Sequence, residues 1–226
     1  MTAAAPPASS PAARFWQNTL GLKAVMAVSG IALFVFVAAH LAGNLQIYEG
    51  PEKLNQYARL LRSMPSLLWG ARITLLVMVI LHIWSAVELF RRKRAARPVD
   101  YRRRAAIAST YASRTMYWSG PIILAFVIYH LMEFTFGVGG TSFQEGDVYE
   151  NVVAGFQHPL VSGFYIFAML LLGLHLAHGL SSLFQTLGFA HPRYTPMLKT
   201  VGTVVAWLIA VGNISIPIAV LAGIVS

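Results

Sequence analysis

Four histidines are the residues of this chain whose type and spacing point most clearly to chemistry. They lie in four separate apolar segments and follow one another at intervals of 42, 48 and 45 residues: His40, His82, His130 and His175. An ionisable side chain inside a membrane span is costly and by default marks a functional site. The spacing therefore predicts one functional histidine on each of four helices.

The composition indicates that these segments are immersed in lipid. Of the 226 residues, 57% are hydrophobic and 11% are charged, whereas a soluble domain carries about 25% charged residues. Because lipid offers no partner for backbone polar groups, helices of about 20 residues are expected. We predict an all-α membrane protein with five transmembrane helices, at residues 23–46, 67–90, 116–136, 160–187 and 201–225. The first four form an up-down bundle, and the fifth packs beside it.

The net charge of +9 is a topology signal and not a nucleic-acid signal. Nine basic residues and one acid lie between the second and third spans, in residues 91–114. The positive-inside rule then places this loop and the N-terminus in the cytoplasm, where the loop contacts anionic lipid or a docked partner. Residues 1–13 are rich in Pro, Ala and Ser and are predicted to be a disordered cytoplasmic tail. Residues 14–226 form the membrane domain.

The depth of each histidine predicts how they pair. His40 and His130 lie about six residues before the outer ends of their spans. His82 and His175 lie about fifteen residues after the outer ends at which their spans begin. At 1.5 Å per residue, the two layers are roughly 9 Å and 22 Å from the outer edge. First and third helices, like second and fourth, are diagonal in an up-down bundle. Depth and topology thus select His40 with His130 and His82 with His175.

Two pairs at different depths favour haem as the ligand. A haem iron takes two axial ligands on opposite faces, whereas zinc requires three or four ligands that converge on one point. The chain has no cysteine, which excludes thiolate ligands, iron–sulfur clusters held by this chain and covalent haem attachment. We predict two non-covalent haem b groups, an outer one on His40/His130 and an inner one on His82/His175.

Three other ionisable side chains lie close to these layers. Arg72 either snorkels to the interface or pairs with a propionate of the outer haem. Glu133 either carries protons at the outer side or only reaches the headgroups. His178, one turn from His175, holds a propionate, lines a quinone pocket or snorkels. Between the first two spans, residues 50–66 read as a short amphipathic helix that covers the outer haem.

Several runs of residues resemble a known family. These are M-x-x-S-G at residues 26–30, L-F-x-F at 33–36, H-L-x-G-N-L at 40–45, YASRTMYWSG at 111–120 and HLAHGLSS at 175–182. They resemble the cytochrome b subunit of succinate dehydrogenase and fumarate reductase, of the single-chain, five-helix, two-haem type. The resemblance covers nearly the whole chain after the N-terminal tail.

The resemblance implies a membrane anchor of succinate:quinone oxidoreductase in the bacterial cytoplasmic membrane. It implies a flavoprotein and an iron–sulfur subunit on the cytoplasmic face, which donate electrons that pass to membrane quinone, with menaquinone as the expected quinone. This chain is then the subunit that does not bind succinate, in a complex that can form a higher oligomer.

The resemblance also implies roles for individual residues. The four axial ligands of the family match His40, His82, His130 and His175. Ser29 and Arg114 are expected near the inner-haem propionates or a quinone. Some fumarate reductases have an acidic residue two positions before the ligand of the fourth span. Gly173 stands there in this chain, which mildly favours succinate oxidation.

Two other functions are compatible with parts of this pattern. A two-haem electron carrier of another oxidoreductase would need the same four histidines but would lack the flavoprotein and iron–sulfur partners. A transporter with a His/Glu/Arg ion path would bind no haem. It would also show broken helices near the midplane, whereas Pro121 is expected at a helix start and Pro217 is isolated in the fifth span.

Overall fold

The computed structural model describes residues 18–96, 111–139, 143–189 and 191–226. Within these ranges the regular structure is helical, without strands. The predicted tail, residues 1–13, and the middle of the basic loop, residues 97–110, lie outside the described residues.

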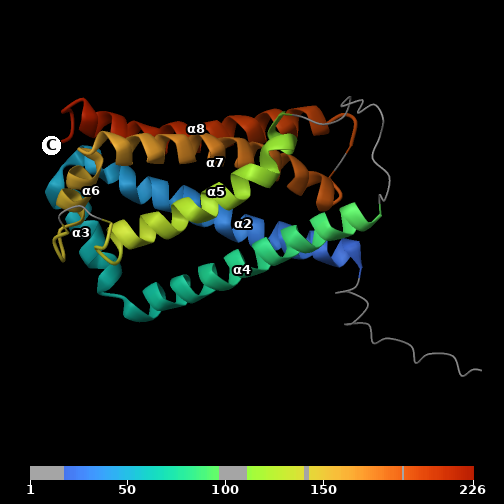
Figure 1. The fold of residues 1–226 in the computed structure, drawn as a ribbon, viewed down its shortest axis with the longest axis horizontal. Coiled ribbons are helices and arrows are strands. Elements are labelled where there is room, and N and C mark those ends of the chain that lie inside the picture. Colours follow the sequence, from blue (N-terminus) through green and yellow to red (C-terminus); the bar gives the residue numbers. More distant parts are fainter. Residues whose placement is uncertain (1–17, 97–110, 140–142, 190) are drawn as a thin grey trace, which may run out of the picture.

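The described ranges contain five long helices, which run from one end of the bundle to the other (Figure 1). They are α2 (Thr19–Asn44), α4 (Pro65–Ala95), α5 (Tyr111–Phe134), α7 (Pro159–Thr186) and α8 (Thr195–Leu221). Each is long and apolar enough to span a bilayer. The predicted fold class, an all-α protein with five membrane-spanning helices, is confirmed.

The helix bounds differ from the predicted spans at the polar ends. α4 continues to Ala95, five residues past its apolar stretch, and its last turn carries Arg92, Lys93 and Arg94. Cations at a helix C-terminus complement the helix dipole, and Lys and Arg are good helix formers. Basic residues that mark the edge of the membrane therefore prolong the helix beyond it.

The start of α5 was predicted wrongly. The span predicted to begin at residue 116 begins five residues earlier, at Tyr111, and Pro121, which was expected at a helix start, lies inside the helix. Residues 111–115, which precede the predicted span, are helical as well. A proline inside a helix removes one backbone hydrogen bond and bends the axis, and α5 changes direction along its length (Figure 1).

The long helices pack in a definite order. α7 packs against both α5 and α8, and α2 packs against α4. Small residues bring α7 and α8 close together: a side chain on Gly173 would lie 3.0 Å from Ala210 Cβ, and Ala168, Ala206 and Ala210 are fully buried. Small residues at helix contacts permit such close approach in membranes.

Two short helices cover one end of the bundle, which we call the cap end (Figure 1). They are α3 (Pro51–Arg62), which follows the 3-10 helix η1 (Leu45–Glu49), and α6 (Val148–Phe156). The short helix predicted within residues 50–66 is present as α3. The opposite end is called the basic end, because α4 carries basic residues at positions 91–94 just before it ends there.

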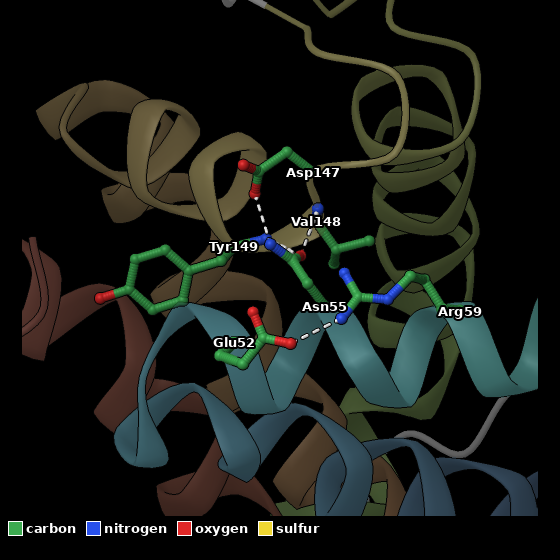
Figure 2. A network of polar contacts seen from close by, with 6 residues as sticks. All are labelled: Glu52, Asn55, Arg59, Asp147, Val148 and Tyr149. Carbon is green, nitrogen blue, oxygen red and sulfur yellow. Dashed lines mark hydrogen bonds and ion pairs between the residues drawn. The ribbon is translucent and has the colours of Figure 1, made fainter.

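A single amide side chain joins the two cap helices (Figure 2). Asn55 of α3 accepts hydrogen bonds from the backbone N–H of Val148 (2.9 Å) and Tyr149 (3.1 Å) and donates one to Asp147 (2.9 Å). The first N–H groups of a helix have no partner within the helix. Asn55 therefore completes the N-terminus of α6 and fixes α6 on α3.

Asp147 caps α6 from the other side. Its carboxylate accepts from the Glu150 N–H at 3.0 Å and from the Asn55 amide. These hydrogen bonds hold the pKa of Asp147 below its ordinary value of 3.8, and the bond from the Glu150 N–H has the largest effect. The cap is thus held by ordinary capping chemistry at residues that lie outside the five long helices.

Candidate functional site

The four histidines that the sequence singles out meet in two pairs. The rings of His40 on α2 and His130 on α5 have centroids 5.8 Å apart, with an interplanar angle of 87°. The rings of His82 on α4 and His175 on α7 have centroids 6.2 Å apart, at 56°. We call His40/His130 the cap pair and His82/His175 the basic-end pair. These are the partners that depth and topology predict.

The pairs meet across the core. Neither α2 with α5 nor α4 with α7 belongs to the closely packed helix pairs of the described chain. Each pair therefore joins two helices that are otherwise held apart, and the imidazoles approach each other from opposite sides. Such an arrangement can supply two imidazole ligands to one metal centre that lies between the rings.

Serine hydroxyls contact both rings of the basic-end pair. Ser29 Oγ lies 3.3 Å from His82 Nδ1, and Ser119 Oγ lies 3.4 Å from His175 Nδ1. Both serines are buried, at 1% and 0% exposure. Ser29 donates its only proton to the Val25 carbonyl at 2.7 Å, so its oxygen accepts from the His82 Nδ1–H. This leaves Nε2 of His82 as the unprotonated nitrogen.

The cap pair has different partners. His130 Nδ1 lies 3.3 Å from the Tyr165 hydroxyl, which donates its proton to Glu133 Oε2 at 2.7 Å. A phenol has one proton to donate. With Glu133 ionised, Tyr165 therefore accepts from the His130 Nδ1–H, and Nε2 of His130 is unprotonated. His40 stacks on Phe36, with centroids 5.3 Å apart at 17°, and its ring makes no hydrogen bond within the described part of the chain.

These observations fit two haems. A metal–imidazole bond of about 2 Å, with each ring centroid roughly 1 Å behind its nitrogen, separates two opposed imidazole centroids by about 6 Å. Metal-bound histidines also donate their second ring N–H to a neighbouring acceptor, as His82 and His130 do. Among the described residues no three His, Asp, Glu or Cys side chains converge on one point, which argues against a zinc site.

The other predicted site residues lie around these pairs. Arg72 is exposed, and its guanidinium lies 5.1 Å from the centroid of the Trp69 ring. Arg114 is exposed near the start of α5. His178 is half-buried, and its Nε2 lies 3.2 Å from the Ser182 hydroxyl. Ser29, which is expected near a propionate or a quinone, contacts His82.

Glu133 does not reach the headgroups, because its side chain is only 1% exposed and is bonded to Tyr165. Tyr165 and Ser119 were missed by sequence reasoning. The depth rule that paired the histidines would have found Tyr165, which lies six residues from the cap end of α7, as His130 lies near the cap end of α5. Ser119 lies inside the span predicted at residues 116–136, but no rule applied to the sequence singled out a serine as a partner of His175.

The fold and these pairs define a multi-pass helical membrane protein with two intramembrane histidine sites. A family model described as succinate dehydrogenase/fumarate reductase transmembrane subunit matches residues 91–211, more than half of the chain. The chain belongs to this family and is thus a membrane subunit of an oxidoreductase complex. The matched region contains His130 and His175, whereas His40 and His82 precede it. No curated protein and no solved structure matches the chain.

Proposed function

We propose that this chain is the two-haem cytochrome b anchor of a succinate:quinone oxidoreductase. The observation that carries the proposal is the presence of two opposed histidine pairs, with ring centroids 5.8 Å and 6.2 Å apart, in a member of this family. The two pairs lie at different depths of one bundle, as a path for electrons across the membrane requires.

Each histidine pair would hold one haem b, without covalent attachment. Haem, when bound, supplies reversible one-electron redox chemistry. His82 and His175 provide the ligands near the basic end, and His40 and His130 provide those near the cap end. Ser29, Ser119 and Tyr165 fix the orientation of three of the four imidazoles. The cap helices α3 and α6 limit the access of water to the cap pair.

The basic end is the cytoplasmic end in this proposal and the docking face for the flavoprotein and iron–sulfur subunits. Arg91, Lys93 and Arg94 are exposed there at the end of α4, and Lys93 reaches across to the Tyr117 hydroxyl of α5 at 3.0 Å. The positive-inside rule supports this orientation. The complex then lies in a bacterial cytoplasmic membrane and exchanges electrons with its quinone, which we propose to be menaquinone.

Three further residues are proposed to contact the cofactors. Arg72 lies seven residues after the start of α4, at the depth of the cap pair, where it can pair with a haem propionate. Arg114 and His178 lie toward the basic end, where a propionate or the quinone headgroup needs a cation or a hydrogen-bond donor.

The proposal is tested by purifying the complex through a tag on this chain. We expect flavin and iron–sulfur subunits to co-purify, and succinate alone to reduce b-type haem in the complex. A chain that purifies with two haems but without these subunits, and that succinate does not reduce, would instead be an electron carrier of another oxidoreductase.

The docking face is tested with two matched charge reversals. Arg91→Glu changes the basic end, and Arg62→Glu changes an exposed arginine of α3 at the cap end. We expect Arg91→Glu to reduce the yield of co-purified flavin subunit and Arg62→Glu to leave it unchanged. The reverse result would place the partner subunits at the cap end.

A further inference from the structure

A hydrogen-bonded chain of three side chains ends at one histidine of the cap pair. It runs from His130 Nδ1 to the Tyr165 hydroxyl (3.3 Å) and on to Glu133 Oε2 (2.7 Å). His130 and Glu133 are one turn apart on α5, and Tyr165 reaches them from α7. We propose that Tyr165 and Glu133 are positioning residues that strengthen His130 as an iron ligand and lower the reduction potential of the cap-pair haem. This proposal rests on the proposed function.

The direction of the hydrogen bonds gives the chain its effect. With Glu133 ionised, Tyr165 donates to Glu133 and accepts from the His130 Nδ1–H, so each proton in the chain lies displaced toward the carboxylate. A histidine whose second N–H is bonded in this way is a more basic ligand. A more strongly donating ligand stabilises the oxidised iron relative to the reduced iron, so the haem becomes harder to reduce.

Glu133 is an unusual residue for its surroundings. It is 1% exposed, none of the ion pairs among the described residues includes it, and its Oε1 is buried without a hydrogen-bond partner. A buried carboxylate is costly unless a positive charge or donors compensate it. An oxidised iron bound by His130, one turn away, would supply that positive charge.

Two glycines close the space around this carboxylate. A Cβ on Gly155 of α6 would lie 3.2 Å from Glu133 Oε1, and a Cβ on Gly139 would lie 2.7 Å from Glu133 Cβ. Backbone from the cap thus packs directly on the acid and keeps it in place. The enclosure excludes water, and this strengthens the influence of the carboxylate on Tyr165.

An aromatic cluster holds the phenol in position. The ring of Tyr165 lies 4.9 Å from Phe126, 4.9 Å from Phe156 and 5.9 Å from Phe134, centroid to centroid and nearly edge to face. Tyr165 is itself only 5% exposed. A group that tunes a ligand must be held by packing as well as by its hydrogen bonds. The cluster meets this requirement for Tyr165.

The test is a redox titration of the whole complex with Tyr165→Phe, which removes only the hydroxyl. We expect the ratio of reduced to oxidised cap-pair haem at a fixed potential to rise about tenfold, which corresponds to 59 mV for a one-electron couple. The cap-pair haem is the one that His130→Ala eliminates. The electron paramagnetic resonance signal of the same haem should shift as well.

The matched control is Tyr149→Phe. Tyr149 is a buried tyrosine at the same end, and its hydroxyl donates to the Ser226 carbonyl at 3.2 Å and touches no histidine. We expect both potentials to stay unchanged in this variant. An equal shift in Tyr149→Phe would mean that a general loosening of the cap, and not the chain to His130, alters the potential.

A double-mutant cycle tests whether Glu133 acts on His130 through Tyr165. Glu133→Gln should shift the same haem in the same direction, and Tyr165→Phe/Glu133→Gln should shift it no further than Tyr165→Phe alone, because Glu133 acts through Tyr165. Fully additive shifts, or two bound haems with unchanged potentials in both single variants, would overturn this inference and leave the proposed function intact. The absence of haem from the wild-type complex would overturn the proposed function itself.

Discussion

The two histidine pairs have the same ligands but different neighbours. The basic-end pair is bonded to two buried serines, Ser29 and Ser119, which are small and neutral. The cap pair lies in an aromatic cluster, and its His130 is linked through Tyr165 to a carboxylate. The two pairs therefore share their residue type, and the second partner of each ring distinguishes one pair from the other.

The two ends of the molecule also differ, in their exposed charge and in the helices that cover them. The basic end finishes in exposed cations on α4, suited to a protein partner. The cap end is closed by α3 and α6, which Asn55 and Asp147 bind together. Exposed cations thus lie near the pair bonded to serines, whereas two packed helices cover the pair linked to a carboxylate.

The largest effect should come from removing one ligand of either pair. His82→Ala should eliminate the basic-end haem and retain the cap haem, whereas His40→Ala should do the opposite, because in the proposed function each iron depends on two histidines. Haem extracted per chain, with the reduced-minus-oxidised spectrum of each variant, measures the loss. His191→Ala, at an exposed histidine outside both pairs, should keep both haems. A variant of either pair that loses both haems while the complex stays assembled would contradict two separate sites.

The next largest effect should be a difference in thermal stability between the cap end and the basic end. Asn55→Ala would remove three hydrogen bonds and leave buried N–H groups of α6 unsatisfied, at a cost of about 2 kcal/mol. We expect the cap-haem spectrum to change at a lower temperature than the basic-end spectrum in thermal unfolding of the complex.

The control for this variant is Glu52→Gln on the same helix. Glu52 forms a 2.7 Å ion pair with Arg59 (Figure 2), but the two side chains are 85% and 57% exposed. Such surface pairs contribute roughly 0–1 kcal/mol, so little change is expected. If Glu52→Gln and Asn55→Ala had equal effects, the amide would not be the link between the cap helices.

A smaller effect is expected from the serine partners of the basic-end pair. Hydrogen bonds to charged groups are about twice as strong as neutral ones, so Ser29→Ala should raise the reduced-to-oxidised ratio of the basic-end haem only about threefold, against tenfold for Tyr165→Phe at the cap. Redox titration of the complex measures both shifts.

Ser85→Ala is the matched control for Ser29→Ala. Ser85 is equally buried and lies on the same helix as His82, but its hydroxyl donates to the His82 backbone carbonyl at 3.0 Å and not to a ring nitrogen. Neither potential should move in this variant. A larger shift in Ser29→Ala than in Tyr165→Phe would reverse the proposed contrast between the two pairs.

The smallest effect concerns the acid sensitivity of the cap. Because the pKa of Asp147 is lower in the folded protein than its ordinary value, its ionised form stabilises the cap above pH of about 4, and this stability is lost as the pH falls through the lowered pKa. Asp147→Asn should lessen the pH dependence of the cap-haem melting temperature below pH 4. An unchanged pH profile would show that Asp147 does not contribute to it.

The sequence was sufficient to predict the spans and the partners within each histidine pair. Apolar length predicts helices, because a lipid environment permits little else, and a fixed rise per residue turns the position of His40 or His175 into a depth. The same rule, extended from histidines to hydroxyl groups, would have placed Tyr165 beside His130.

Other features could not be predicted because they depend on contacts between distant segments. The nine residues of α6 are helical because Asn55, more than ninety positions away, bonds to their first N–H groups. The burial of Glu133 depends on Gly155 and Gly139 closing over it. The early start of α5, at Tyr111, lies in a segment that hydropathy alone does not mark as a span.

The most direct test of the central claim is the number of haems bound per chain in the purified complex. Alkaline pyridine extraction with protein quantification should give two haem b groups per chain, and redox titration should resolve two one-electron transitions. One haem per chain, or none, would contradict the proposal that His40/His130 and His82/His175 are separate haem-binding sites.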